Sequence, residues 1–445
     1  MTRLIGMVVL IAAVLAGLAG LCAVFYLAAA GLAYLFARGG WPASYGAAIA
    51  NVLTLMLVVM MVSASLLTVA ERKWSAMMQN RVGANRIKIF GTALGGIPFL
   101  AADALKMLTK ERVEPRGATR ILFELAPALA FAPVFALFAV IPVGPPVPAH
   151  QIIAGAASVT ETIALQVAQP DVGLLYVFAI ASLQVYGTAL AGWASNNKLG
   201  LLGGVRASSQ MISYEVSLGL SLVGTMIAYR TLRLDEMVVA QGASVLGPVP
   251  ALGILLQPLG FLVFFASAFA ETKRAPFDLP EGESEIVGYF IEYSGMKFGL
   301  MFLAEFVEIV ILSGIVTAVF LGGWHPVLFE EWLRLHLTPL WFAAVGAAAF
   351  LAKMIVMMWL QLTIRWLLPR FRFDQIQKLC WKILLPTALA NVFITAAAML
   401  IDPSRTLLAW IGVGTIVVIA VLTTAAGRAP SAEHGHDAAH AAAGH

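Results

Sequence analysis

Residues 271–297 combine acidic, basic and apolar side chains in a way that suits proton exchange. The acids are Glu271, Asp278, Glu281, Glu283, Glu285 and Glu292, and the bases are Lys273, Arg274 and Lys297. Apolar residues such as Phe277 and Ile286 lie between them, which indicates partial burial. Carboxylates held together away from water lose hydration and repel one another, so some of their pKa values rise toward neutrality. The alternative interpretation is a solvated charged surface.

The spacing of two of these acids suggests how a proton could travel. If the chain becomes helical after Gly282, Glu285 and Glu292 lie seven residues apart on nearly the same face. Their separation along the axis is then about 10 Å. That distance favours proton transfer through bridging water over direct contact.

A second charged segment, 71–120, begins with Glu71, Arg72 and Lys73. Further along, Asp103, Lys106 and Lys110 follow an i, i+3, i+7 spacing, so a helix would present them on one face. The pattern predicts an amphipathic helix at the membrane surface. Such a helix either contributes to a ligand site or anchors the chain through basic residues and an i, i+3 ion pair.

Ionisable residues also occur inside long apolar stretches, where they are costly and often functional. They are Glu215, Glu305, Glu308 and Lys353. Each either has a functional role or forms an ion pair or hydrogen bond with another helix. Glu124 lies close enough to the boundary of its stretch to reach the surface, which favours a structural role.

The overall composition requires a lipid environment. Of 445 residues, 60% are hydrophobic and 12% are charged, and the mean hydropathy is +0.89. The net charge of +4 is better explained by membrane topology than by nucleic-acid binding. Cys22 and Cys380 provide no ligand set for a metal or an iron–sulfur cluster. Any redox chemistry therefore depends on a borrowed or diffusible cofactor.

About ten apolar stretches are long enough to cross a hydrocarbon core of roughly 30 Å. They lie near residues 5–37, 43–70, 121–142, 172–193, 211–228, 251–270, 298–320, 339–362, 383–401 and 406–426. The fold class is therefore all-α, a polytopic membrane helix bundle, and none of the stretches carries an obvious break. The first is read as a retained span and not as a cleaved signal.

The distribution of basic residues predicts the orientation. The segments on one side contain only Arg38, Arg230, Arg233, Arg334 and Arg405. Apart from Lys353, the other Lys and Arg residues lie on the opposite side, which places both termini in the cytoplasm. The outer segment 143–171 is expected to be a loop with a short surface helix. Residues 428–445 are expected to form a disordered tail rich in His and Ala, for which metal binding is the alternative.

Several motifs in the inner segments resemble one known family. They are Glu71-Arg72-Lys73, residues 79–86, Ala102-Asp103 with Lys106, residues 191–197, Arg206-Ala207, Ile212-Ser213-Tyr214-Glu215, residues 274–285, Glu292-Tyr293-Ser294-Gly295 and residues 369–375. The long run Arg274-Ala275-Pro276-Phe277-Asp278-Leu279-Pro280-Glu281 is the most specific of them. In this order and over about four-fifths of the chain, they resemble the heel subunit of respiratory complex I, which is the bacterial H subunit of NADH:quinone oxidoreductase.

The resemblance implies an eight-helix core at 43–401, with an extra helix before it (1–42) and another after it (402–427). The inner loops 71–120, 194–210, 271–297 and 363–382 would surround a tilted cavity that admits a quinone, ubiquinone or menaquinone, from the bilayer. Electrons would come from iron–sulfur subunits of a peripheral arm. Protons would pass to small and antiporter-like membrane subunits, all in the bacterial inner membrane.

Site residues follow from the same resemblance. The quinone-cavity candidates are Glu71, Arg72, Asp103, Lys106, Arg274 and Asp278. The proton-coupling candidates are Glu215, Glu281, Glu283, Glu285 and Glu292. No metal site is expected in this chain, and catalysis requires the other subunits.

Some features depart from the family. Glu308 has no recognised counterpart, Ala84 replaces a proline, and the segment from Glu285 to Glu292 is one residue short. Three alternatives stay open at this point: a membrane subunit of an energy-converting nickel–iron hydrogenase, a quinone reductase with a donor other than NADH, and a secondary transporter.

Overall fold

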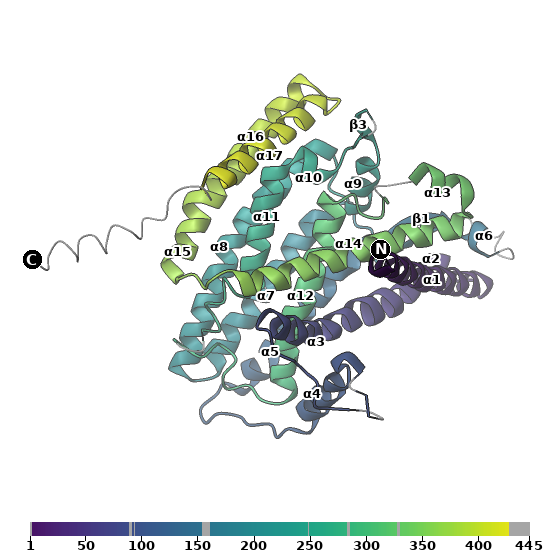
Figure 1. The fold of residues 1–445 in the computed structure, drawn as a ribbon. Coiled ribbons are helices and arrows are strands. Elements are labelled where there is room, and N and C mark those ends of the chain that lie inside the picture. The colour runs from purple at the N-terminus through teal and green to yellow at the C-terminus, as the bar shows by residue number, and fades with distance from the viewer. Residues whose placement is uncertain are drawn as a thin grey trace, which may run out of the picture.

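The computed structural model describes residues 2–88, 91–92, 94–153, 161–247, 249–282, 285–326 and 330–426. In these ranges the chain folds as a bundle of long helices with two small two-stranded sheets (Figure 1). The predicted all-α membrane bundle is confirmed. The predicted tail at 428–445 and Glu283 both lie outside the described residues.

The α-helices are α1 (Thr2–Arg38), α2 (Ala43–Asn51), α3 (Met61–Met78), α4 (Pro98–Thr109), α5 (Arg120–Leu137), α6 (Ala149–Ile152), α7 (Gly173–Ala194), α8 (Lys198–Tyr229), α9 (Leu234–Gln241), α10 (Gly253–Leu256), α11 (Pro258–Glu271), α12 (Met296–Phe320), α13 (Glu330–His336), α14 (Pro339–Leu367), α15 (Phe373–Leu379), α16 (Leu385–Ile401) and α17 (Thr406–Ala426). Two π-helical turns, η1 (Val52–Met60) and η4 (Cys380–Leu384), join α2 to α3 and α15 to α16. The 3-10 segments are η2 (Leu94–Gly96) and η3 (Phe138–Val140). The strands are β1 (Gly144–Pro148), β2 (Thr162–Leu165), β3 (Ser244–Leu246) and β4 (Val249–Pro250).

Nine helical stretches in the described ranges are long and apolar enough to cross a membrane. They correspond to nine of the predicted spans. The tenth, predicted at 251–270, is interrupted, so the expectation of unbroken spans was wrong here. The interruption lies at Gln257, whose backbone leaves the helix before Pro258 begins α11. Because Pro258 has no backbone N–H, it suits the first turn of a new helix.

The short helix α11 explains why the acid-rich segment is buried. A helix of 14 residues is about 21 Å long, shorter than the hydrocarbon core. Lys273 and Arg274, just after its end, pair with Glu308 and Glu305 of α12. Irregular backbone is tolerated at such a depth when protein surrounds it. Both basic side chains are indeed almost fully buried.

Helix boundaries in the segments predicted as inner loops differ from the prediction. Most of the predicted loop 194–210 is helical, because α8 begins at Lys198, where the Asn197 side chain accepts a hydrogen bond from the Leu199 N–H. The predicted loop 363–382 shrinks to a short connection between α14 and α15. A Cβ at Gly203 would lie 2.8 Å from the Tyr289 nitrogen, so glycine allows the acid-rich segment to lie against α8.

The helix considered after Gly282 does not form in the described residues. From 285 to 295 the chain makes successive turns, with positive φ at Val287 (68°), Gly288 (138°) and Gly295 (61°). Positive φ is incompatible with a right-handed helix. The expected helical alignment of Glu285 and Glu292 was therefore wrong.

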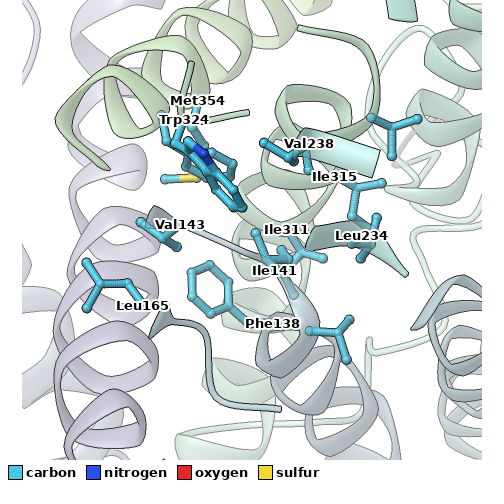
Figure 2. Close-up of a cluster of buried hydrophobic side chains, with 14 of the residues drawn as sticks. Phe138, Ile141, Val143, Leu165, Leu234, Val238, Ile311, Ile315, Trp324 and Met354 are labelled. Carbon is cyan, nitrogen blue, oxygen red and sulfur yellow. The ribbon is translucent and has the colours of Figure 1, made fainter. Parts of the chain in front are cut away.

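The end of the bundle that carries β1 and β2 contains an apolar core around α12 (Figure 2). Phe138 and Ile141 meet Ile311 and Ile315 of α12 there, and Trp324 covers them. The outer segment predicted as a loop with a short helix contains α6, but also the antiparallel pair β1–β2. α12 is the most deeply buried of the candidate spans. It is therefore a fixed central element that can position charged side chains.

The terminal helices α1 and α17 pack against the rest of the bundle. The Tyr26 hydroxyl donates a hydrogen bond to the Pro145 carbonyl at 2.7 Å, which ties α1 to β1. On α17, a Cβ at Gly412 would lie 1.8 Å from the Leu255 carbonyl oxygen, so this glycine permits close contact with α10. Both helices are thus integral parts of the fold.

Candidate functional site

A buried cluster of charges connects α3, α11, α12 and α14. Arg274 lies 3.3 Å from Glu71 through Nη1 and 3.3 Å from Glu305 through Nη2. Its guanidinium also lies over the Phe306 ring, 4.2 Å from the centroid. Arg365, near the end of α14, forms a second ion pair with Glu71. Alternating positive and negative groups let these charges stay buried.

The position of Arg274 favours its charged form. Burial alone would lower its pKa, but Glu305 and Glu71 outweigh that effect and the pKa is raised. The guanidinium therefore remains a permanent cation in a dry region. We refer to Arg365, Glu71, Arg274 and Glu305 as the Arg274 cluster.

The next two acids of the segment lie close to this cluster. Asp278 forms an ion pair with Arg370 at 2.6 Å, yet burial raises its pKa above the usual value. The pKa of Glu281 is raised further, first by burial and then by the nearby carboxylate of Glu305. Both acids can thus hold protons closer to neutral pH than an ordinary carboxylate.

Two further predicted acids, Glu285 and Glu292, lie beside the N-terminal part of α8. Glu285 pairs with Arg206 at 2.7 Å and is half exposed. Glu292 accepts a hydrogen bond from the Asn197 side chain at 2.6 Å. They are therefore separate from the Arg274 cluster.

Arg72 and Asp103 form an ion pair at 2.6 Å that joins α3 to α4. The predicted helix around Asp103 is present as α4, although Lys110 lies just beyond its end. The i, i+3 interpretation expected Asp103 to pair with Lys106. In the structure Asp103 pairs with Arg72 instead. Lys106 itself is exposed on α4 and is not brought to the cluster.

A largely apolar pocket of about 230 Å³ opens between α3, α4 and α12. Its lining includes Thr68 of α3, Asp103 and Met107 of α4, and Phe302 of α12. The Phe302 ring also faces Arg274, whose guanidinium carbon is 5.7 Å from the ring centroid. The Phe302 ring therefore borders both the pocket and the Arg274 guanidinium.

Glu215 lines a much smaller cavity deeper in the bundle. The space that the centre of a water molecule could occupy there is about 20 Å³. Gln184, Glu271 and Glu308 also line the cavity. A volume of roughly 10–15 Å³ is enough for one water. The structure thus places three carboxylates around a site of the size of one or two waters.

Two other ionisable residues of the spans have structural partners. The Lys353 ammonium donates hydrogen bonds to three backbone carbonyls after α12, those of Leu321, Gly323 and His325, at 2.7–2.9 Å. Glu124 pairs with Lys297 at 2.6 Å, near the inner end of its helix. The contacts of Lys353 and Glu124 therefore fit a structural role.

Several members of the site were missing from the predicted set. Glu305 and Glu308 had been noticed as charges inside a span, and Glu271 and Lys273 only as members of the charged segment 271–297, whereas Arg365 had been assigned no role. Arg365 fell in the predicted loop 363–382, so its place inside a helix, and with it the need for a buried partner, became apparent only when α14 was seen to extend to Leu367. The partner, Glu71, lies 294 residues away in the chain and has no local signature.

Comparison with known proteins gives a consistent result. The sequence model of the family described as NADH dehydrogenase matches residues 50–396. The second form of the NADH-quinone oxidoreductase H subunit in Syntrophobacter fumaroxidans is 42% identical over 361 residues, covering 81% of this chain and 98% of that protein. The first form in Geobacter metallireducens is 43% identical over 344 residues (77% and 94%), and the second form in Geobacter sulfurreducens is 44% identical over 354 residues (79% and 95%). All residues of the Arg274 cluster fall within the matched range, whereas α1 and α17 lie outside it.

Proposed function

The chain belongs to the family of the H subunit of NADH-quinone oxidoreductase, complex I, and from this premise we propose how its residues serve quinone reduction. It is one membrane subunit of that enzyme. Its family membership sets aside the hydrogenase and transporter alternatives raised by the sequence. The electron carriers belong to other subunits, and the quinone is a substrate shared with them.

We propose that the quinone enters through the pocket between α3, α4 and α12. The lining suits an isoprenoid quinone, because it is mostly apolar and has a polar group, Asp103, at the α4 side. Phe302 connects the pocket to Arg274, which can donate hydrogen bonds to a quinone oxygen. The observation that carries this proposal is the contact of one ring, Phe302, with both the pocket and the buried guanidinium.

The pocket and cluster divide the predicted cavity residues into two groups. Arg72, Asp103 and Lys106 belong to the entrance on α3 and α4. Arg274 with Glu71 forms the inner end, and Asp278 lies beside it. The sequence proposed all six simply as cavity residues, and we now propose an entrance role for the first group and headgroup binding for the second.

In this proposal the buried acids couple quinone reduction to proton movement. Reducing a quinone to a quinol consumes two protons, so proton-binding groups near the headgroup respond electrostatically to that change. Glu281 is the best placed, because its pKa is raised and Glu305 lies next to it. In this proposal protons pass onward by way of Glu215, while Glu285 and Glu292 lie apart from that route beside α8.

The same proposal places the chain in the bacterial inner membrane with both termini in the cytoplasm. The inner loops would then face the iron–sulfur subunits of a peripheral arm. Membrane faces of the bundle would contact lipid and the small and antiporter-like subunits. Either ubiquinone or menaquinone satisfies the chemistry of the pocket.

Purification from the native membrane in mild detergent tests the proposal. We expect this chain to co-purify with flavin and iron–sulfur subunits, and the preparation to reduce quinone with NADH in a reaction blocked by quinone-site inhibitors. Co-purification with a nickel–iron subunit, or a lone chain without activity, would contradict it.

A further inference from the structure

Glu308 connects two parts of the site that are otherwise separate. It lies one helical turn beyond Glu305 on α12, so both side chains are on the same face. Glu305 belongs to the Arg274 cluster, whereas Glu308 lines the small cavity with Glu215. We propose that Glu308 and Lys273 form a proton-transfer pair between the Arg274 cluster and Glu215, an inference that rests on the proposed function.

The contacts of Glu308 leave one oxygen free for a proton. Oε2 accepts a hydrogen bond from the Gln184 side chain at 3.0 Å and lies 3.8 Å from the Lys273 ammonium. Oε1 is buried and has no hydrogen-bond partner among the described residues. The side chain is only 4% exposed, so bulk water does not reach it. A buried oxygen without a partner is costly, and a proton or a bound water would satisfy it.

The cavity provides the place for that water. Its open volume of about 20 Å³ exceeds what one molecule needs, and it adjoins three carboxylates and an amide. A water there would have polar partners on Glu308, Glu271 and Glu215. It would therefore join the free oxygen of Glu308 to both other acids.

Lys273 interacts with two of these carboxylates. It pairs with Glu308 and also interacts electrostatically with Glu271, the last residue of α11. At 3.8 Å from Glu308, the ammonium is beyond hydrogen-bonding distance, so no close contact fixes it to one partner. By contrast, Lys297 lies 2.6 Å from Glu124 in a fixed pair. Lys273 can thus follow the negative charge from one carboxylate to the other.

The transfer conserves charge and atoms. When Glu308 carries the proton, Lys273 neutralises the ionised Glu271. The O–H bond of Glu308 breaks, the proton passes through the cavity water, and an O–H bond forms on Glu271, after which Lys273 turns to the newly ionised Glu308. Glu215 exchanges protons with Glu271 through the same water. The net charge of the group stays constant, which avoids an unpaired charge in the membrane interior.

The test uses the assembled complex in proteoliposomes, with NADH oxidation and proton uptake measured together. We expect Glu308→Gln, which keeps the size of the side chain and its bond from Gln184, to lower proton translocation by at least about tenfold, because a positioned proton carrier is lost. Glu308→Asp keeps a carboxyl and should restore a measurable part of it. Full proton translocation by Glu308→Gln, or equal loss in both variants, would overturn the proposal.

A double variant separates proton transfer from a merely structural ion pair. If Lys273 and Glu308 only neutralise each other, Lys273→Met with Glu308→Gln should recover the wild-type ratio of protons to NADH. We expect the ratio of protons to NADH in the double variant to stay low. Glu124→Gln is the matched control, because it breaks another Lys–Glu pair and should leave the ratio unchanged. An unmodified complex without NADH:quinone activity would instead refute the proposed function itself.

Discussion

Replacing Arg274 with methionine tests the central charge cluster most severely. The substitution keeps an unbranched apolar side chain over the Phe306 ring but removes the cation between Glu71 and Glu305. Arg365 still neutralises Glu71, so Glu305 becomes the carboxylate without a basic partner. We expect both the stability of the complex and the binding of quinone to suffer.

The contacts set the size of both effects. Breaking a buried ion pair by removing one partner costs about 3–5 kcal/mol. Protonation of Glu305 would relieve part of that cost, so we expect the lower end of the range. A hydrogen bond from a charged donor contributes about 1.5–3 kcal/mol. If Arg274 donates one to the quinone headgroup, the apparent KM should rise by roughly 10- to 100-fold, because about 1.4 kcal/mol corresponds to a factor of ten.

Thermal unfolding of the purified complex measures the first effect, and the dependence of NADH oxidation on quinone concentration measures the second. Adding Glu305→Gln to Arg274→Met removes the unpaired carboxylate, so stability should recover while the KM stays high. Arg274→Lys keeps the charge but cannot bridge both acids, and should be intermediate. An unchanged KM in an assembled Arg274→Met complex would refute the assignment of this residue to the quinone site.

Three further predictions concern residues outside the Arg274 cluster. Burial raises the pKa of Glu281 above its usual 4.5, so above pH 4.5 the folded protein holds a proton that the unfolded chain has released. Stability should therefore fall as pH rises above 4.5, and Glu281→Gln should make the unfolding temperature depend less on pH there. Lys353→Met leaves three carbonyls without their donor and should lower stability by about 3 kcal/mol in thermal unfolding, with quinone KM unchanged. Glu285→Gln breaks only a half-exposed pair with Arg206, so a loss of stability above about 1 kcal/mol would contradict its surface placement.

The membrane spans were predictable from the sequence because hydropathy reflects the requirement that lipid imposes on every crossing segment. The interruption at Gln257 was missed, although Pro258 is a local signal for a helix boundary, because the other residues of 251–270 are almost all apolar. The side chain of Gln257 bonds Asn391 and Thr395 of α16, and such distant contacts stabilise the break. A local pattern contains no information about them.

The same limit applies to the charged residues. The resemblance to a known family identified Glu71 and Arg274 as candidates. The sequence could not pair Glu71 with Arg365, nor bring Glu308 to Lys273, since each pair joins different helices. The turns after Gly282 were also unpredictable, because Val287 adopts a positive φ that is rare for a β-branched residue.

Photoaffinity labelling is the most direct test that the pocket between α3, α4 and α12 carries the quinone toward Arg274. The purified complex would be illuminated with a photoreactive quinone, and the labelled peptides of this chain identified with and without a quinone-site inhibitor. We predict labelling of α4 or α12 near Met107 and Phe302 that the inhibitor abolishes. Inhibitor-sensitive labelling confined to other parts of the chain, or to other subunits, would contradict the proposed entry path.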